Sequence, residues 1–283
     1  FFEINAAPTD FDEVMRSVAD FIRDHPGKRI AVVTSGGTMV PIEKRMVRFL
    51  DNFSGGRRGA ASAEYFLAHD YAVIFLHRRF TVQPYSRRFM ITATTNFLDF
   101  LVQGPNDSVH VIPEWAVKLQ EVLTLHNQIK EKNTLLKVGF GTVAEYLWLL
   151  RGIAQLVNGH NSLLYCAAAV SDFYIRPSEM VEHKISNADG LTLKLDNVPK
   201  MLDHLFNVWA PQSFAVSFKL ETDPNLLEPK AQKALKEYGH ELVIGNLLHN
   251  YPDRVVYFQT DKESLVVERS PKEIEDSVDI EEK

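Results

Sequence analysis

The hydrophobic and polar positions of the chain follow two periods, one typical of helices and one of buried strands. Residues 10–24 place Phe11, Val14, Val18, Phe21 and Ile22 on one face of a helix. Short apolar runs predict buried strands at 29–34, 71–76, 135–138, 162–167, 214–218, 242–245 and 255–258. Helical segments are predicted between them, near 59–69, 94–103, 114–131, 143–157, 200–207 and 226–238. Continuously apolar strands that alternate with helices predict an α/β fold, with a doubly wound, mostly parallel, Rossmann-like sheet covered on both faces.

One segment departs from this alternation. Residues 183–190 end in a turn signal, and residues 191–195 alternate apolar and polar positions. This pattern predicts a hairpin inserted near 183–195, serving as a flap over a site or as an arm to a second subunit that spans approximately 183–197. No repeat or linker divides the rest, so residues 1–283 are predicted to form one domain.

The connection after the first predicted strand is unusually long. Gly36 and Gly37 follow the strand at once, whereas the next helix is expected only near Gly59. Because strand-to-helix connections usually take about 2–6 residues, a much longer loop is expected to have a function. It is rich in glycine and hydroxyl groups, and Arg57 and Arg58 stand where cations oppose the helix dipole. The composition predicts a phosphate-binding loop ahead of a helix N-terminus.

Composition and charge exclude several classes of protein. The formal net charge is −6 and no long basic run is present, which argues against nucleic acid as a partner. No apolar stretch approaches the roughly 18 residues of a membrane span, so no membrane partner is expected. The single cysteine, Cys166, lies in an apolar strand, which predicts a core residue and a reducing, cytoplasmic location. Because the chain begins with Phe1, a targeting segment is not tested by this sequence.

Known cofactor motifs are missing from the expected places. The dinucleotide fingerprint does not follow the first strand, and the second strand ends in His77, Arg78 and Arg79 rather than in a ribose-binding acid. A Walker A motif is also absent, and the histidines show no zinc-ligand spacing. We therefore expect no NAD, no haem and no zinc.

Polar, glycine-bearing segments stand at the ends of four predicted strands. They are residues 35–38, 167–174, 217–223 and 245–246. In doubly wound sheets, ligands bind at the carboxyl ends of the strands near the switch in strand order. These ends are therefore predicted to form one site.

Four segments together resemble phosphopantothenoylcysteine synthetase, also called phosphopantothenate–cysteine ligase, in its free-standing eukaryotic form. They are residues 33–38 (VTSGGT), 48–59 (RFLDNFSGGRRG), 167–174 (AAAVSDFY) and 217–223 (SFKLETD). The resemblance covers most of the chain, whereas residues 104–134 and the C-terminal tail carry little of it. It implies activation of the 4′-phosphopantothenate carboxylate by a nucleoside triphosphate to an acyl-nucleotide. Cysteine then attacks to form the amide of coenzyme A synthesis.

The resemblance also implies the partners of the reaction. Mg²⁺ would accompany ATP, which is favoured, or CTP, and would bind mainly through phosphates. No protein ligand of the metal is assigned, although Glu221 and Asp223 are candidates. The small-molecule substrates are 4′-phosphopantothenate and L-cysteine, and the protein would be a homodimer with sites shared between subunits.

Roles carried over from the family fall on matching positions of this chain. The catalytic residues would be Asn52, which orients the acyl-nucleotide, and Lys184, in a mobile basic loop that is thinner in lysine than in the bacterial form. The nucleotide would be bound by Gly36, Ser54, Gly56, Gly59, Phe218 and Asn246. Phosphopantothenate would be bound by Asn52, Arg48, Ala168, Ala169 and Asp172, with Ala168, Ala169 and Asp172 coming from the neighbouring subunit.

Other interpretations remain open at this point. Asn52 also suits a turn and Phe218 a hydrophobic core, and Asp172 could serve as a cap. A non-catalytic scaffold on the same fold is a second hypothesis for the whole chain, and its acidic tail at 273–283 is compatible with it. An NAD(P)-dependent oxidoreductase is a third, weakened by the missing fingerprint.

Overall fold

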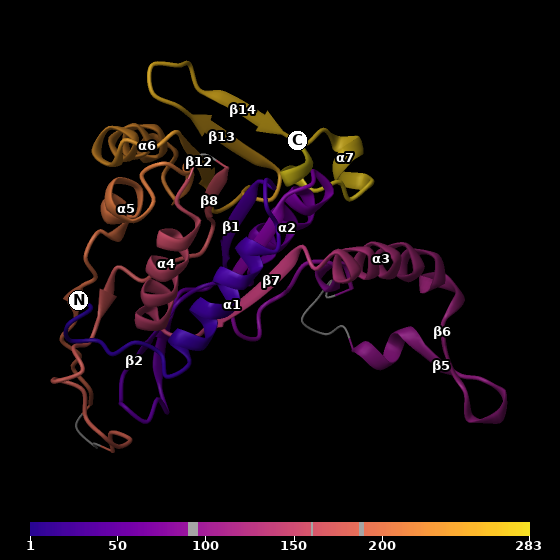
Figure 1. The fold of residues 1–283 in the computed structure, drawn as a ribbon, viewed down its shortest axis with the longest axis horizontal. Helices are drawn as coiled ribbons and strands as arrows, with labels where there is room; N and C mark the ends of the chain where they lie inside the picture. The colour runs from indigo at the N-terminus through magenta and orange to yellow at the C-terminus, as the bar shows by residue number, and fades with distance from the viewer. Residues whose placement is uncertain (90–95, 160, 187–189) are drawn as a thin grey trace.

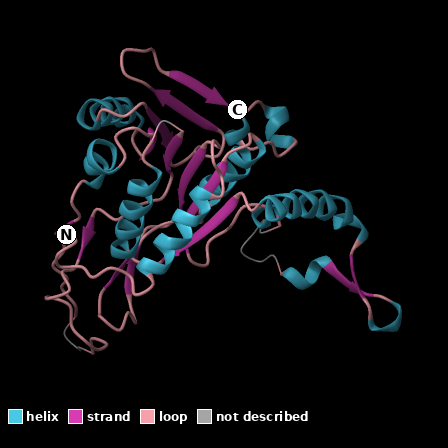
Figure 2. Ribbon diagram, in the orientation of Figure 1, coloured by secondary structure: helices cyan, strands magenta, loops and turns pink. Residues whose placement is uncertain are grey.

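The computed structural model describes residues 1–89, 96–159, 161–186 and 190–283 of the chain. Its centre is an eight-stranded sheet in the order β14-β13-β12-β11-β8-β1-β4-β7 (Figures 1 and 2). The strands are β1 (Ile30–Ser35), β4 (Ala72–Arg78), β7 (Leu135–Phe140), β8 (Ser162–Cys166), β11 (Phe214–Glu221), β12 (Leu242–Leu247), β13 (Arg254–Phe258) and β14 (Leu265–Glu268). The six from β12 to β7 are parallel, while β13 and β14 are antiparallel additions at one edge. The predicted doubly wound, mostly parallel sheet is confirmed.

Helices cover both faces of the sheet. They are α1 (Phe11–Arg23), α2 (Arg57–Ala68), α3 (Pro113–Lys132), α4 (Val143–Val157), α5 (Met201–His204), α6 (Pro224–Tyr238) and α7 (Pro271–Glu275). On one face, Val32 and Leu164 of the sheet pack in a cluster with α1, α4 and the α5 region. On the other face, Val33 and Phe75 pack in a cluster with α2, and α3 adds Val122 to it. Each strand sends alternate side chains to the two layers, as the continuous apolar runs require.

The order of the strands reverses beside β1. From β1 the chain adds β4 and β7 on one side, and β8, β11 and β12 on the other. The carboxyl ends of β1, β8, β11 and β12 therefore lie next to one another at one edge of the sheet. This arrangement confirms the predicted convergence of the four polar segments, and it is the place where doubly wound sheets bind ligands.

The predicted helix at 94–103 is wrong for the described residues. Phe97–Phe100 form a 3₁₀ turn, and β5 (Leu101–Gln103) pairs with β6 (Val109–Val111) in a hairpin; residues 94 and 95 lie outside the described ranges. The chain reverses at Gly104 and Pro105, where a Pro-containing turn favours a hairpin over a helix. The hairpin and α3 extend away from the central sheet (Figure 1).

The long loop contains structure of its own. A small hairpin, β2 (Met39–Pro41) with β3 (Phe49–Asp51), occupies its middle, and α2 begins two residues earlier than predicted, at Arg57. A second short ladder joins β9 (Phe173–Tyr174) to β10 (Asp196–Asn197). It lies against the first, because β2 contacts β9.

The hairpin predicted at 183–195 is not formed within 183–186 and 190–195; residues 187–189 lie outside the described part. Leu193 and Leu195 pack against the core cluster on the α4 side instead. Lys194 between them is exposed, so part of the apolar–polar alternation reflects a segment that packs on the body of the protein.

Two further predictions from the sequence concern membrane spans and Cys166. None of the helices in the described ranges is both long and apolar enough to cross a bilayer. Cys166 is buried as a free thiol in β8, which confirms its prediction as a core residue.

Candidate active site

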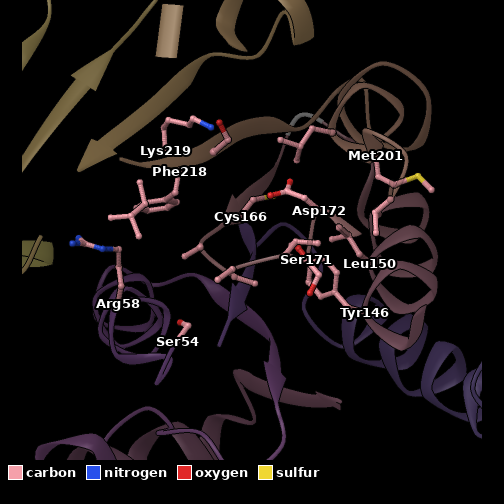
Figure 3. A pocket seen from close by; sticks show the side chains of 18 of the residues that line it. Ser54, Arg58, Tyr146, Leu150, Cys166, Ser171, Asp172, Met201, Phe218 and Lys219 are labelled. Carbon is pink, nitrogen blue, oxygen red and sulfur yellow. The ribbon is translucent and has the colours of Figure 1, made fainter. Parts of the chain in front are cut away.

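A cavity of about 520 Å³ opens at the carboxyl edge of the sheet. Its walls come from the loop before α2, the segment after β8, the ends of β11 and β12, and the start of α5 (Figure 3). Side chains on a strand alternate between the two faces, so the cavity has one part on the α2 face and another on the α4–α5 face. Arg58, Phe218 and Ser54 lie together on the first part, whereas Tyr146, Leu150 and Met201 lie on the second (Figure 3).

The segments after β1 and β8 are joined by backbone hydrogen bonds. Ala169 N donates to Gly36 O at 2.8 Å, and Thr38 N donates to Ala169 O at 3.0 Å. The buried Ser171 reinforces the contact, because its backbone N–H donates to the Thr38 hydroxyl at 2.9 Å. The two loops form a rigid floor, as a preorganised site requires.

Asn52 is held on this floor. Its backbone N–H donates to Thr38 O at 3.3 Å, and its Oδ1 accepts from the Ser171 hydroxyl at 3.4 Å. A Cβ added to Gly37 would lie 1.9 Å from Asn52 O, so only glycine permits this approach. With Oδ1 engaged, the amide N–H groups of Asn52 remain available as donors.

The N-terminus of α2 is built by close packing against β1. Gly56 caps the helix with a φ of 79°, and its carbonyl accepts from the Ser35 hydroxyl at 2.9 Å. Gly59, in the first turn, faces Ser35 across the helix–strand contact. The arrangement leaves the first backbone N–H groups of α2 at the cavity, where they suit an anion.

Replacing Gly59 by alanine is expected to disturb this contact. The new Cβ would lie 2.6 Å from Ser35 Cβ, and relief of such crowding costs about 1–3 kcal/mol. We expect a lower unfolding free energy in denaturant titration and weaker binding of a nucleoside triphosphate in calorimetry. Gly55→Ala is the matched control, because nothing lies within 4 Å of its Cβ position. An unchanged unfolding free energy in Gly59→Ala would contradict the assigned packing role.

The acidic C-terminal tail folds back onto this helix. Arg58 pairs with Glu281 at 3.1 Å and donates to Tyr251 O at 2.5 Å. Its guanidinium lies 5.8 Å from the Phe218 ring centroid. The tail therefore supplies an anion that offsets one of the two cations at the start of α2. Arg57 is exposed and makes no ion pair with any described residue.

Phe218 and Asn246 share the α2 face of the sheet. Leu220 is paired with Asn246 across β11 and β12, and Phe218 lies two residues before it. Phe218 packs edge-on against Tyr165 with ring centroids 5.0 Å apart. Asn246 is buried, and its Oδ1 has no hydrogen-bond partner in the described ranges. An unpaired buried acceptor in a cavity wall is typical of a ligand-binding group.

The α4–α5 part of the cavity has a different character. Cys166 and Ser217 line it from neighbouring strand positions, together with the Tyr146 ring. Burial raises the pKa of the Cys166 thiol to about 12 and also raises the pKa of Tyr146. Both side chains are therefore uncharged near neutral pH.

The residues proposed from the sequence fall into three groups. Seven line the cavity: Ser54, Gly56, Ala168, Ala169, Asp172, Phe218 and Asn246. Gly36, Gly59 and Asn52 lie directly behind this lining, at the contacts described above. Arg48 and Lys184 belong to neither group.

Arg48 is engaged outside the cavity of its own chain. It pairs with the fully buried Glu43 at 2.8 Å and donates to Ile185 O at 3.0 Å. Its contacts hold the pKa of the Glu43 carboxyl below its usual range, against the opposing effect of desolvation. Lys184 is exposed on the adjoining segment. In a single chain, both residues belong to the surface beside β2 and β3.

The described residues contain no cluster of three or more side chains suited to a metal ion. Glu221 is paired with Lys219 and Lys230, and Asp223 caps α6 by accepting from Asn225 N.

Several lining residues were not identified from the sequence. Tyr146 and Leu150 come from α4, Met201 from α5, and Tyr251 from the loop after β12. Ser171 lies within the motif at 167–174, and this position was the one sequence feature that could have identified it as a site residue. The others reach the cavity through the packing of helices that lie far away in the sequence.

Comparisons with known proteins agree with this geometry. Residues 126–281 match the family described as DNA/pantothenate metabolism flavoprotein C-terminal domain. Phosphopantothenate–cysteine ligase 2 from Oryza sativa subsp. japonica is 43% identical over 96% of this chain and 86% of its own length. The Homo sapiens phosphopantothenate–cysteine ligase is 44% identical over 91% of this chain and 84% of its own length.

Solved structures give the same result for the fold. A Cab2 mutant in complex with phosphopantothenate-cysteine is 41% identical, with a TM-score of 0.91 over all of this chain and 93% of its own. A Streptococcus pneumoniae DNA/pantothenate metabolism flavoprotein is 20% identical over 89% of this chain and 96% of its own, with a TM-score of 0.58, and shares the fold.

Proposed function

Because the chain belongs to the phosphopantothenate–cysteine ligase family, we propose that its cavity activates 4′-phosphopantothenate with ATP and then joins it to cysteine. The chain is a ligase of coenzyme A biosynthesis that forms an amide bond. We place it in the cytoplasm, and the free thiol of Cys166 supports a reducing compartment.

The proposal is carried by one observation, the cavity that joins a helix N-terminus to an aromatic wall. Phosphates would lie at the start of α2, where Gly56, Ser54 and the backbone N–H groups face the cavity. The nucleoside would lie along Phe218. The unpaired Oδ1 of Asn246 suits the exocyclic amino group of a base, which adenine and cytosine both carry. We favour ATP.

The reaction would proceed in two steps at this edge. A carboxylate oxygen of phosphopantothenate attacks the α-phosphorus, and pyrophosphate leaves. The cysteine amine then attacks the acyl carbon, the bond to the nucleotide oxygen breaks, the nucleoside monophosphate leaves, and one proton is released. Asn52 would orient the acyl-nucleotide through its amide N–H groups, and fixed donors of this kind stabilise developing negative charge.

Mg²⁺ would accompany the triphosphate and neutralise part of its charge. Asp172 is the acidic side chain in the cavity lining, and we place it beside phosphopantothenate with Ala168 and Ala169. The other acidic candidates are engaged within the protein, Glu221 in ion pairs with Lys219 and Lys230 and Asp223 as the cap of α6. This arrangement fits a metal that arrives with the nucleotide and is held by its phosphates.

We propose a homodimer formed through the surface around β2, β3 and β9. Large apolar side chains are exposed there: Met46, Val47, Phe49, Leu50, Phe53 and Phe173. Phe53 is fully exposed and stands next to Asn52. Arg48 and Lys184 lie on the same side without lining their own cavity. A partner subunit would cover the apolar surface and bring these residues to its site, where Arg48 and Lys184 would meet the substrate phosphates.

Mixing two inactive variants tests whether the sites are shared. An Asn52→Asp chain and a Lys184→Ala chain should each be weak, whereas their heterodimer would contain one intact site, with Asn52 from one subunit and Lys184 from the other. Since half of randomly mixed dimers are heterodimers, about a quarter of wild-type activity should return. Mass spectrometry of the intact dimer gives the heterodimer fraction. A verified heterodimer without recovery would show that each site is built within one subunit.

A direct assay tests the activity itself. Purified protein would be supplied with Mg²⁺, 4′-phosphopantothenate and cysteine, with ATP and CTP in parallel. We expect pyrophosphate release that requires phosphopantothenate, and amide formation once cysteine is added. If no pyrophosphate is released with either nucleotide, and a cooperative unfolding transition shows that the protein is folded, the result would favour a non-catalytic scaffold.

A further inference from the structure

Ser217, in the wall of the cavity on the face opposite Phe218, forms a buried pair with His240 behind it. Ser217 lies in β11, and His240 lies in the connection between α6 and β12. The Ser217 hydroxyl and His240 Nε2 are 2.7 Å apart, and both residues are buried. The imidazole stacks on Phe206 with centroids 4.8 Å apart, which fixes the plane of the ring.

The proton arrangement of this pair follows from its surroundings. Burial lowers the pKa of His240 to about 4, so the imidazole is neutral near pH 7 and has one N–H group. Its Nδ1 is buried and has no partner among the residues that the structure describes. A buried N–H without an acceptor is less tolerated than a bare acceptor, so the proton belongs on Nε2. His240 then donates to Ser217.

A serine that accepts from histidine must direct its own proton elsewhere. The Ser217 hydroxyl has no other partner within the described ranges, and Ser217 lines the cavity. It is therefore a fixed hydrogen-bond donor toward a ligand. His240 has no group at Nδ1 to orient it as a general base, so the pair is not built as a nucleophile.

The neighbouring side chains indicate what the ligand is. Lys219 lies two residues beyond Ser217 on the same face of β11, so an ammonium group stands beside the hydroxyl donor. The ammonium pairs with Glu221 at 3.4 Å, and Glu221 also pairs with Lys230 at 2.7 Å, which leaves Lys219 able to bind a second carboxylate. The Tyr146 ring, Leu150 and Met201 line the same cavity from α4 and α5 and supply largely apolar surface. A hydroxyl and a cation suit a carboxylate, and the wall suits a small uncharged side chain.

We propose that the α4–α5 part of the cavity binds an α-amino acid with a small uncharged side chain, with Ser217 and Lys219 on its carboxylate. This rests on the proposed function, in which the amino acid is L-cysteine. The nucleotide would occupy the α2 face, so the opposite face gives the amine an approach to the acyl carbon at the edge between them. His240 is a positioning residue that acts through Ser217.

The chemistry of this wall favours attack by nitrogen. The Cys166 thiol stays protonated there because burial disfavours the thiolate. A substrate thiol in the same surroundings would also stay protonated and would be a poor nucleophile. The amine then forms the C–N bond, the acyl C–O bond to the nucleotide breaks, and the proton lost by nitrogen goes to solvent.

Kinetics of Ser217→Ala test the subsite. We expect its KM for L-cysteine to rise about 10-fold or more, because one hydrogen bond to a charged group is lost. The KM values for ATP and phosphopantothenate should not change. Ser213→Ala is the matched control, since Ser213 is also a buried serine bonded to a side chain, Ser162, outside the cavity lining. Equal increases for all three substrates, or no increase for cysteine, would overturn the proposal.

Variants of His240 test the positioning role. His240→Leu should raise the cysteine KM in wild type and add little in the Ser217→Ala background, while His240→Gln, which keeps a donor, should recover part of the affinity. Fully additive effects would show that His240 does not act through Ser217.

A panel of amino acids provides a second measurement on the wild-type protein. L-2-Aminobutyrate should be used about 10-fold better than L-serine, because Leu150 and Met201 present apolar groups to the side chain. Equal use of the two would overturn the apolar assignment. Pyrophosphate release without any amino acid is measured in parallel. If no pyrophosphate is released, the proposed function is refuted. If it is released, the comparison of amino acids tests the subsite alone.

Discussion

Asn52→Asp should halt the reaction at the acyl-nucleotide. Asn52 is held by Thr38 and Ser171, and its amide N–H groups remain free to donate. Aspartate has nearly the same shape but only accepts, and it adds a negative charge beside a phosphate-rich intermediate. Loss of one such donor costs about 10²–10³ in rate. Amide formation should fall by this factor, while pyrophosphate is still released in a burst and the acyl-nucleotide is detected by mass spectrometry.

A matched variant separates this effect from the general cost of the substitution. Asn158 also accepts a hydrogen bond through Oδ1, from Gln212 N, but lies at the end of α4 away from the cavity lining. Asn158→Asp keeps that acceptor and should turn over normally. Normal turnover by Asn52→Asp would refute the assigned role of Asn52, even with nucleotide binding intact.

Arg87→Ala should destabilise the fold by about 3–5 kcal/mol, the usual cost of removing one partner of a buried ion pair. The Arg87 side chain is 3% exposed and bonds Glu64 of α2 at 2.8 Å. It also bonds Asp279 of the C-terminal tail at 2.5 Å. Its loss leaves the buried Glu64 carboxylate with weaker compensation and frees the tail that carries Glu281. Unfolding in denaturant, followed by circular dichroism, measures the change.

Arg23→Ala is the control for this substitution. Arg23 pairs with Asp20 at 2.8 Å, but both side chains are largely exposed. Exposed helix pairs contribute about 0.3–0.5 kcal/mol, so the control should remain close to wild type. Equal effects of the two substitutions would show that the network around Arg87 adds nothing to stability beyond an exposed ion pair.

Local sequence patterns were sufficient to predict the main helices and strands. A continuous apolar run such as 162–167 suits a strand buried on both faces, and helical periodicity marked α1 and α4 within one residue of their observed bounds. The glycine and arginine content of the long loop indicated an anion site, and Gly56 and Gly59 do lie at the start of α2. The errors, at 94–103 and 183–195, fell on short segments where a turn or a packing contact outweighs a weak local pattern.

Contacts between distant residues account for what was missed. Arg87 was part of a polar, arginine-rich loop in the sequence, yet its partner Asp279 lies 192 residues away, and the acidic tail that had suggested a scaffold proves to hold α2. Likewise, nothing in the sequence near Ser217 marks His240 as its partner.

Periodicity, glycine placement and the four recognised motifs thus specified the sheet, the glycine-rich loop ahead of α2 and the family, because each depends on residues close together in the chain. The two-sided cavity, the unpaired Asn246 and the Ser217–His240 pair depend on which strands become neighbours and which face each side chain takes. Those properties arise from contacts between residues that are far apart in the sequence, and no local pattern predicts them.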